Sequence, residues 1–180
     1  MSEALLEGNE EQLKNEYSDD LSNSSSLEEQ YLSFSLGEEI YAVDILSVQE
    51  IRTWEKPTFL PRSPDFMKGV LNLRGTIVPV IDLRLKFRIC KPVYCDTTVV
   101  IILRYETNDQ MKIMGIVVDA MSDVLFIEKE NIRNAPEFGG RVDAVYIDGL
   151  TTVNDAVVSL LNTGAILNID DINHSIVEAN

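Results

Sequence analysis

Carboxylates are the commonest groups in this chain that could do acid–base chemistry, and two of them lie four residues apart. Asp119 and Asp123 flank an expected strand junction, and paired acids are the usual machinery of glycoside hydrolysis. Such sites usually occupy a deep cleft, whereas a single tryptophan, Trp54, gives the chain little aromatic surface to line one. A small β-barrel hydrolase using this pair is therefore the weaker alternative, and turn or interface carboxylates are the stronger interpretation.

Other catalytic groups are scarce. The one histidine, His174, lies near the end of the chain, and a Ser-His-Asp or Cys-His site would need it. Cys90 and Cys95 are the only cysteines, too few for the three or four ligands of a zinc site. Phosphate-binding glycine motifs and calcium loops are missing. The sequence predicts no catalytic residue, no metal and no cofactor, with two free thiols that could otherwise meet across a turn.

One arginine lies between two apolar runs. Val70–Leu73 and Ile77–Ile81 flank Arg74-Gly75, which predicts a hairpin whose glycine supplies the positive φ of a tight reversal. Pro79 has no backbone donor, so its strand is expected to be an edge or bulged at that point. Since a desolvated cation without a partner costs several kcal/mol, Arg74 is expected to pair with a carboxylate or to face something outside the fold.

Charge is distributed unevenly along the 180 residues, whose formal net charge is −15. Residues 1–30 hold nine acids and one base, which predicts a disordered acidic tail over residues 1–28, with solubility and spacing as its simplest role. Residues 51–100 hold nine bases and four acids. Binding to duplex nucleic acid usually needs a broader positive face than this one basic stretch can provide. The stretch suits a protein partner that carries carboxylates, or else it forms a mixed solvated surface.

Membrane insertion is not expected either. The chain starts with no basic, apolar leader of the secretory type, and its densest apolar run, Val99–Leu103, is far shorter than a membrane span. These features predict a cytoplasmic protein. Trp54 lies in an expected loop beside Pro57 and Phe59, where it is either a plug between lobes or an anchor for a partner.

Short runs with period two predict about ten strands and no long helix, typical of an all-β protein with small barrels. Short helical turns are expected after Asp44, Ser63 and Asp82, and at Ala165–Ile172. Two lobes are expected to meet near residues 88–96, with a strand able to cross between them. The expected strands are Gln30–Leu36, Ile40–Val43, Val48–Ile51, Val70–Leu73, Ile77–Ile81, Thr97–Tyr105, Met111–Asp119, Ser122–Glu128, Val142–Val153 and Ala156–Leu161.

Three motifs, Asp44–Ile51, Gly69–Leu83 and Gly115–Val124, together closely resemble the CheW family of bacterial chemotaxis coupling proteins. The resemblance implies two SH3-like five-stranded β-barrel lobes around a shared hydrophobic core, in one domain over residues 29–172 with a C-terminal tail at 173–180. It also implies a non-catalytic adaptor that joins the cytoplasmic tips of methyl-accepting chemoreceptors to the regulatory domain of a CheA-type histidine kinase. Such an adaptor would be recruited to membrane-associated receptor arrays.

The resemblance also implies a partner-binding site. Glu50 and Arg74 would form a charged pair near a groove between the lobes, which accepts the receptor's helical hairpin. The kinase would contact a separate barrel end. The acidic tail and a long turn at 106–110 depart from the family pattern. The groove would be lined by Ile45, Val48, Leu73 and Gly75, shaped by Gly69 and Asn72, and closed on its other side by Val117, Val118, Asp119 and Ser122.

Overall fold

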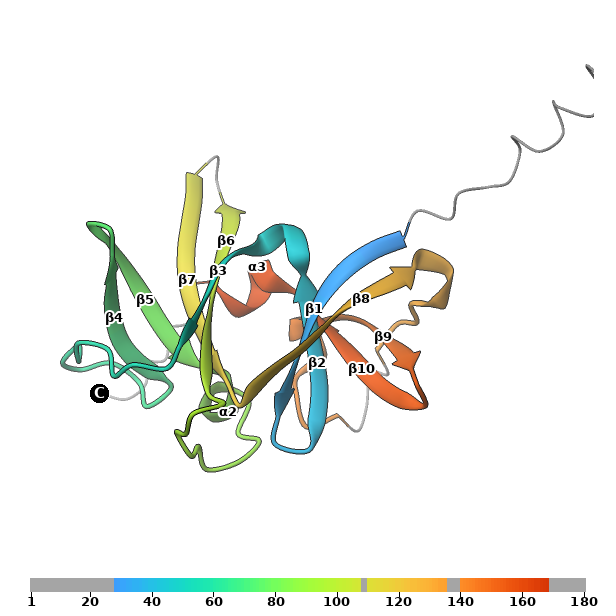
Figure 1. The fold of residues 1–180 in the computed structure, drawn as a ribbon, viewed down its shortest axis with the longest axis horizontal. Coiled ribbons are helices and arrows are strands. Elements are labelled where there is room, and N and C mark those ends of the chain that lie inside the picture. The colour runs from blue at the N-terminus through green and yellow to red at the C-terminus, as the bar shows by residue number, and fades with distance from the viewer. Residues whose placement is uncertain (1–27, 108–109, 136–139, 169–180) are drawn as a thin grey trace, which may run out of the picture.

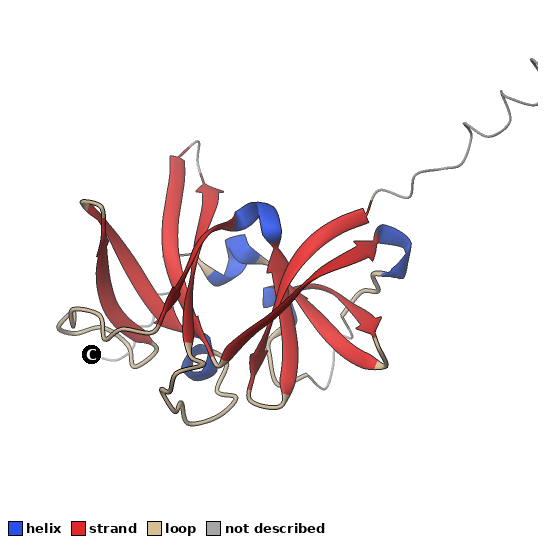
Figure 2. Ribbon diagram, viewed as in Figure 1, coloured by secondary structure: helices blue, strands red, loops and turns tan. Residues whose placement is uncertain are grey.

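The computed structural model describes residues 28–107, 110–135 and 140–168. Within these ranges ten strands form two five-stranded sheets, joined by short helices (Figures 1 and 2). The strands are β1 (Glu28–Leu36), β2 (Glu39–Asp44), β3 (Val48–Thr53), β4 (Met67–Leu73), β5 (Thr76–Asp82), β6 (Val99–Thr107), β7 (Gln110–Val118), β8 (Ala120–Glu128), β9 (Ile147–Val153) and β10 (Ala156–Leu161). The helices are η1 (Ile45–Ser47), α2 (Leu83–Lys86), η2 (Lys129–Asn131), η3 (Ala144–Tyr146) and α3 (Thr163–Ile166).

The two sheets share one topology. The first has the order β8-β1-β2-β10-β9 and the second β3-β6-β7-β5-β4. In each, a hairpin (β1–β2 or β6–β7) occupies the centre, and one of its strands runs parallel to a strand of a second hairpin (β10 or β5). A short helix follows that strand in both lobes. Its N-terminus is capped by a side chain, from Asp82 before α2 and from Asn162 before α3.

Each sheet curls until its two edges touch at a single bridge. In the second lobe Thr58, which follows β3, pairs with Val70 of β4, and in the first lobe Arg133 pairs with Leu150 of β9. A glycine precedes each strand-side partner because the backbones come close there. A Cβ on Gly69 would lie 2.1 Å from the carbonyl oxygen of Thr58, and Gly149 is crowded in the corresponding way. The lobes are thus SH3-like sheets rather than completely closed barrels.

A shared hydrophobic core lies between the lobes. Phe34 and Leu36 of β1 pack in the same cluster as Ile101 and Leu103 of β6 and Ile116 of β7. Each lobe has in addition a smaller cluster of its own. Central strands are therefore buried on both faces, which explains why β6 begins with an uninterrupted apolar run rather than an alternating one.

The chain passes between the lobes twice, at η1 after β2 and at Asp119 after β7. One lobe is consequently continuous, from β3 to β7, whereas the other is assembled from both ends of the domain (Figure 1). Residues 88–96, the expected meeting point of the lobes, join α2 to β6 within the continuous lobe. Their Ile89 nevertheless lies against the other lobe, since a Cβ on Gly37 would be 3.3 Å from its Cγ2.

All ten expected strands are present, and the all-β fold is confirmed. Three local predictions were wrong. The Ser63 region is not helical, because the Ser63 hydroxyl donates to the carbonyl of Leu60 instead of capping a helix. The strand expected from Val142 starts only at β9, after η3. Most of the long turn at 106–110 belongs to β6 and β7, which pair as far as Thr107 and Gln110.

The predicted tails lie outside the described residues, except that Glu28 already belongs to β1. The expected C-terminal helix is α3, four residues long, and the segment from 169 onward is likewise outside the described ranges. None of the helices in those ranges has the length and apolar character needed to span a bilayer.

Candidate functional site

Arg74 projects from the turn between β4 and β5. It has φ 51° and the following Gly75 has φ 90°, the positive values that a tight reversal requires. The side-chain oxygen of Asn72 accepts a hydrogen bond of 2.8 Å from the Gly75 amide, which fixes the turn. The Arg74 side chain is 89% exposed, and its Nη2 lies 3.7 Å from Oε2 of Glu50 on β3. The predicted carboxylate partner is therefore present, but the cation is not desolvated.

The Glu50–Arg74 pair spans the two edge strands of the continuous lobe. Glu50 also approaches Arg52, at 3.7 Å, and Arg52 in turn contacts Glu55 at 3.1 Å. Exposed pairs of this kind contribute only about 0–1 kcal/mol to stability. These alternating charges therefore contribute little to the stability of the fold, and they are accessible on the surface for contact with a partner.

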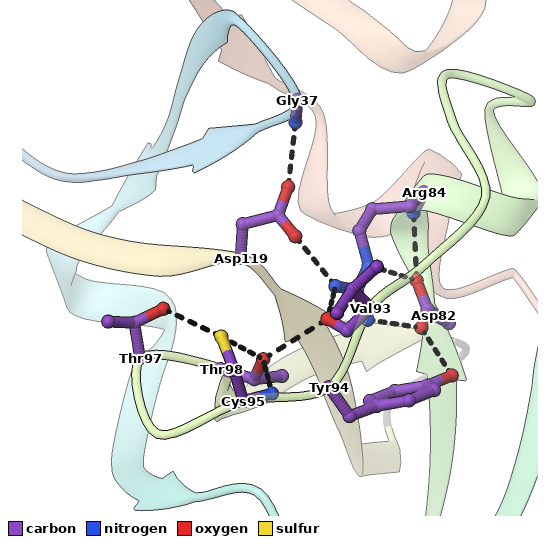
Figure 3. A network of polar contacts seen from close by, with 9 residues as sticks. All are labelled: Gly37, Asp82, Arg84, Val93, Tyr94, Cys95, Thr97, Thr98 and Asp119. Carbon is purple, nitrogen blue, oxygen red and sulfur yellow. Dashed lines mark hydrogen bonds and ion pairs between the residues drawn. The ribbon is translucent and has the colours of Figure 1, made fainter.

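A second arginine, Arg84, has the desolvated guanidinium and the carboxylate partner that were expected for Arg74. Arg84 of α2 is completely buried, and its Nε and Nη2 donate to the two carboxylate oxygens of Asp82 at 3.0 and 2.7 Å (Figure 3). Its Nη1 donates to Asp119 at 2.6 Å and to the carbonyl of Val93 at 3.0 Å. The guanidinium lies 4.9 Å from the ring centre of Tyr94, whose hydroxyl donates to Asp82.

Electrostatics keep Arg84 charged. Burial alone lowers the pKa of this guanidinium, but hydrogen bonds and charge from Asp82 and Asp119 outweigh it and raise the pKa above the ordinary arginine value. Burial also raises the pKa of the Tyr94 hydroxyl, and the neighbouring Asp82 adds to that rise. The Arg84 guanidinium therefore stays charged inside the fold, with the carboxyl groups of Asp82 and Asp119 as its side-chain partners.

Asp119 connects this cluster to the other lobe. One carboxylate oxygen accepts from Arg84, and the other accepts from the Gly37 amide at 2.7 Å, in the turn between β1 and β2 (Figure 3). The Asp119 amide itself donates to the carbonyl of Ser35. Since Asp119 lies where the chain passes from β7 to β8, it ties the two lobes together at a crossover.

The predicted groove residues do not lie on one surface. Leu73, Val117 and Val118 are buried in the core clusters, so their side chains are unavailable to a partner in this conformation. Ile45 and Val48 are half-buried against the shared core. Gly69 lacks a side chain, which allows the backbone of Thr58 to come close. Ser122 is exposed on β8 of the other lobe.

The hydrolase alternative has no geometric support. Both carboxylate oxygens of Asp119 already accept hydrogen bonds, one of them from a buried guanidinium, which suits an ion-pair acceptor better than a general acid. Asp123 is exposed, and its backbone is held by the Ser33 hydroxyl. No group of three or more potential metal ligands occurs in the part of the chain that the structure describes.

Two features escaped the sequence analysis. One is Arg84, whose only sequence signal is its position two residues after Asp82, at the end of an apolar strand. The other is the edge strand β8, where Met121, Val124 and Phe126 are exposed, the last of them by 63%. An unpaired edge that carries apolar side chains is a natural protein-contact surface.

The fold of the described residues defines a two-lobed SH3-like protein. The sequence profile of the CheW-like domain matches residues 30–171, and the chain belongs to the CheW family. It is 43% identical over 143 residues to the chemotaxis protein CheW of Klebsiella aerogenes, covering 79% of this chain and 84% of that protein. The corresponding protein of Bacillus subtilis is 30% identical over 139 residues, covering 77% and 86%.

A solved structure supports the same assignment. The crystal structure of the scaffolding protein TtCheW from Thermoanaerobacter tengcongensis superimposes with a TM-score of 0.70 at 30% identity, covering 78% of this chain and 88% of that one. This chain is accordingly a chemotaxis scaffold protein of the CheW family, and members of that family are non-catalytic.

Proposed function

We propose that this protein couples the cytoplasmic tips of chemoreceptors to a CheA-type histidine kinase at membrane-associated arrays. The observation that carries the proposal is the rigid connection of two lobes that present different surfaces. A shared core and the Arg84–Asp119–Gly37 contacts fix the lobes relative to each other. A coupling protein needs this property, because two partners must be held in one geometry for one to influence the other.

The receptor surface is centred on Arg74. Its guanidinium is exposed beside Glu50. Charged side chains of a helical hairpin can therefore form ion pairs with both residues, which fixes the position of the hairpin along this surface. Asn72 and Gly75 hold this turn in shape. Ile45 and Val48, with the highly exposed Leu46 between them, supply apolar contact area on η1 and β3. Leu73, Val117 and Val118 support this surface from inside the core.

The kinase surface is the exposed edge of β8. It combines Met121, Val124 and Phe126 with unpaired backbone groups along the outer side of the strand. A second β-sheet domain can add to such an edge, and its apolar side chains can cover the exposed ones. Ser122 lies on this strand and belongs to this second surface in the proposal.

The test is the binding of an Arg74→Asp variant to purified receptor-tip fragments. Reversal of the charge beside Glu50 is expected to weaken receptor binding at least tenfold, a loss of about 1.4 kcal/mol, with the melting temperature unchanged because the pair is exposed. Arg133→Asp, an exposed arginine of the other lobe, is the matched control and is expected to bind normally. Equal receptor binding by both variants would contradict the assignment of this surface.

A further inference from the structure

A cavity of about 290 Å³ lies beside the connection from β3 to β4, and neither Glu50 nor Arg74 lines it. Its lining residues are Trp54, Lys56, Pro57, Phe59, Lys68 and Tyr94. The rings of Trp54 and Tyr94 are stacked with their centres 4.4 Å apart and 18° between their planes. Trp54 is half-buried and packs on the inner cluster of its own lobe, so it does not act as a plug between lobes.

The rim of this cavity is apolar and positively charged at once. Phe59 is 68% exposed, and Lys68 Nζ lies 5.8 Å from the ring centre of Tyr94. Among the described residues, neither Lys56 nor Lys68 has a carboxylate within ion-pair distance. Aromatic faces next to unneutralised ammonium groups fit a peptide segment that carries both an aromatic ring and acids.

Such a segment is present in this chain. Residues 1–27 contain seven carboxylates and one lysine, and the acids Glu16, Asp19 and Asp20 surround Tyr17. The eleven residues from Tyr17 to the start of β1 can extend over about 36 Å. The start of β1 and the connection from β3 to β4 lie on opposite sides of the domain (Figure 1), whose radius of gyration is about 14 Å for its size, so the segment has to be close to fully extended to meet the cavity.

We propose that residues 16–20 dock in the Trp54 cavity of the same molecule, with the Tyr17 ring against Trp54 and Phe59 and the acids beside Lys56 and Lys68. The contact is intramolecular, so its strength depends on the reach of the linker and not on the protein concentration. The acidic tail then occupies a surface of the continuous lobe that would otherwise be open to a partner protein. Any acidic segment of another protein would have to displace it to bind there.

Trp54 is the sole tryptophan, so its fluorescence reports this site in the full chain. Tyr17→Ala is expected to raise the constant for acrylamide quenching of Trp54 by about twofold or more, because release of the segment opens the site. Lys56→Glu combined with Lys68→Glu is expected to do the same, and adding Asp19→Lys with Asp20→Lys to that variant is expected to restore protection. Glu10→Gln with Glu11→Gln, which removes charge elsewhere in the tail, is the matched control.

Circular dichroism of each variant verifies that the fold is intact. Unchanged quenching in Tyr17→Ala would overturn the proposal, and so would an equal effect of the Glu10 and Glu11 control. Protection that disappears on dilution would show docking between two copies instead of within one. Protection that ignores the tail variants and arises only when purified kinase or receptor fragments are added would assign the cavity to a partner, and would also contradict the proposal.

Discussion

The Arg84 guanidinium donates to the Asp119 carboxylate at 2.6 Å, and the other oxygen of that carboxylate accepts from the backbone of the opposite lobe. This pair is therefore the polar counterpart of the shared hydrophobic core. It connects the end of the β4–β5 hairpin to the turn between β1 and β2 (Figure 3). Loss of either partner leaves the other charge with an incomplete set of contacts.

Asp119→Asn is expected to lower the free energy of unfolding by about 2–3 kcal/mol, since removal of one partner from a buried ion pair leaves an uncompensated charge and Asp119 itself is partly exposed. Urea denaturation measures the difference. Asp123→Asn is the matched control, because that side chain is exposed and only its backbone is bonded. It is expected to change stability by less than about 0.5 kcal/mol. Similar losses in both variants would contradict the role assigned to Asp119.

Two glycines of one hairpin are expected to respond differently to alanine. Gly69→Ala places a Cβ 2.1 Å from the Thr58 carbonyl oxygen, at φ 131°, and is expected to cost at least about 3 kcal/mol because the backbone has to move. Gly75→Ala meets no atom within 4 Å and is expected to cost only about 1 kcal/mol of backbone strain. Thermal unfolding of the two variants distinguishes them. A larger loss at Gly75 would mean that the Thr58–Val70 bridge does not close the lobe.

Cys95 is expected to react with iodoacetamide faster than Cys90 at neutral pH. Hydrogen bonds from Thr97 and Thr98 lower the pKa of the Cys95 thiol, whereas burial, followed by the nearby Asp119 charge, raises the pKa of Cys90. The thiolate is the reactive form, so a lower pKa means more of it at a given pH. Peptide mass spectrometry over time measures both sites, and Thr97→Val is expected to slow Cys95. Faster modification of Cys90 would contradict these environments.

Phe126→Glu is expected to weaken binding to the kinase regulatory domain and to leave receptor binding intact. The side chain is exposed on the edge strand β8, so the change is expected to leave stability within about 0.5 kcal/mol. Val157→Glu, an equally exposed apolar position on β10 of the same lobe, serves as the control. Calorimetric titration with each partner separates the two effects. Normal kinase affinity in Phe126→Glu would remove β8 from the proposed interface.

Sequence patterning predicted the strands well because most of them carry their own turn chemistry. Gly75 after Arg74, Asp44 before η1 and Asp82 before α2 each marked a reversal or a helix start that the structure contains. Pro79 lies one residue before the pairing of β5 with β7 begins, at Val80, as its missing donor requires. Each of these signals depends only on neighbouring residues, so it can be recognised from the sequence alone.

Long-range placement was harder to foresee. An apolar residue on a strand is expected to have one buried and one open face, yet Val117 and Val118 are both buried because β7 lies between the shared core and the inner cluster of its lobe. The desolvated cation that needs a carboxylate is Arg84, whereas Arg74 is exposed. Arg84 and Asp119 are 35 residues apart in the sequence, and this spacing does not predict their contact.

The proposed function requires this protein to join two partners that do not otherwise form a stable complex. Co-sedimentation of receptor-tip assemblies with purified CheA-type kinase, with and without this protein, tests it most directly, together with the rate of kinase autophosphorylation. We expect the kinase to sediment with the receptor assemblies, and its rate to change, only when this protein is present. Kinase that sediments equally without it, or a rate that stays the same with it, would contradict the account.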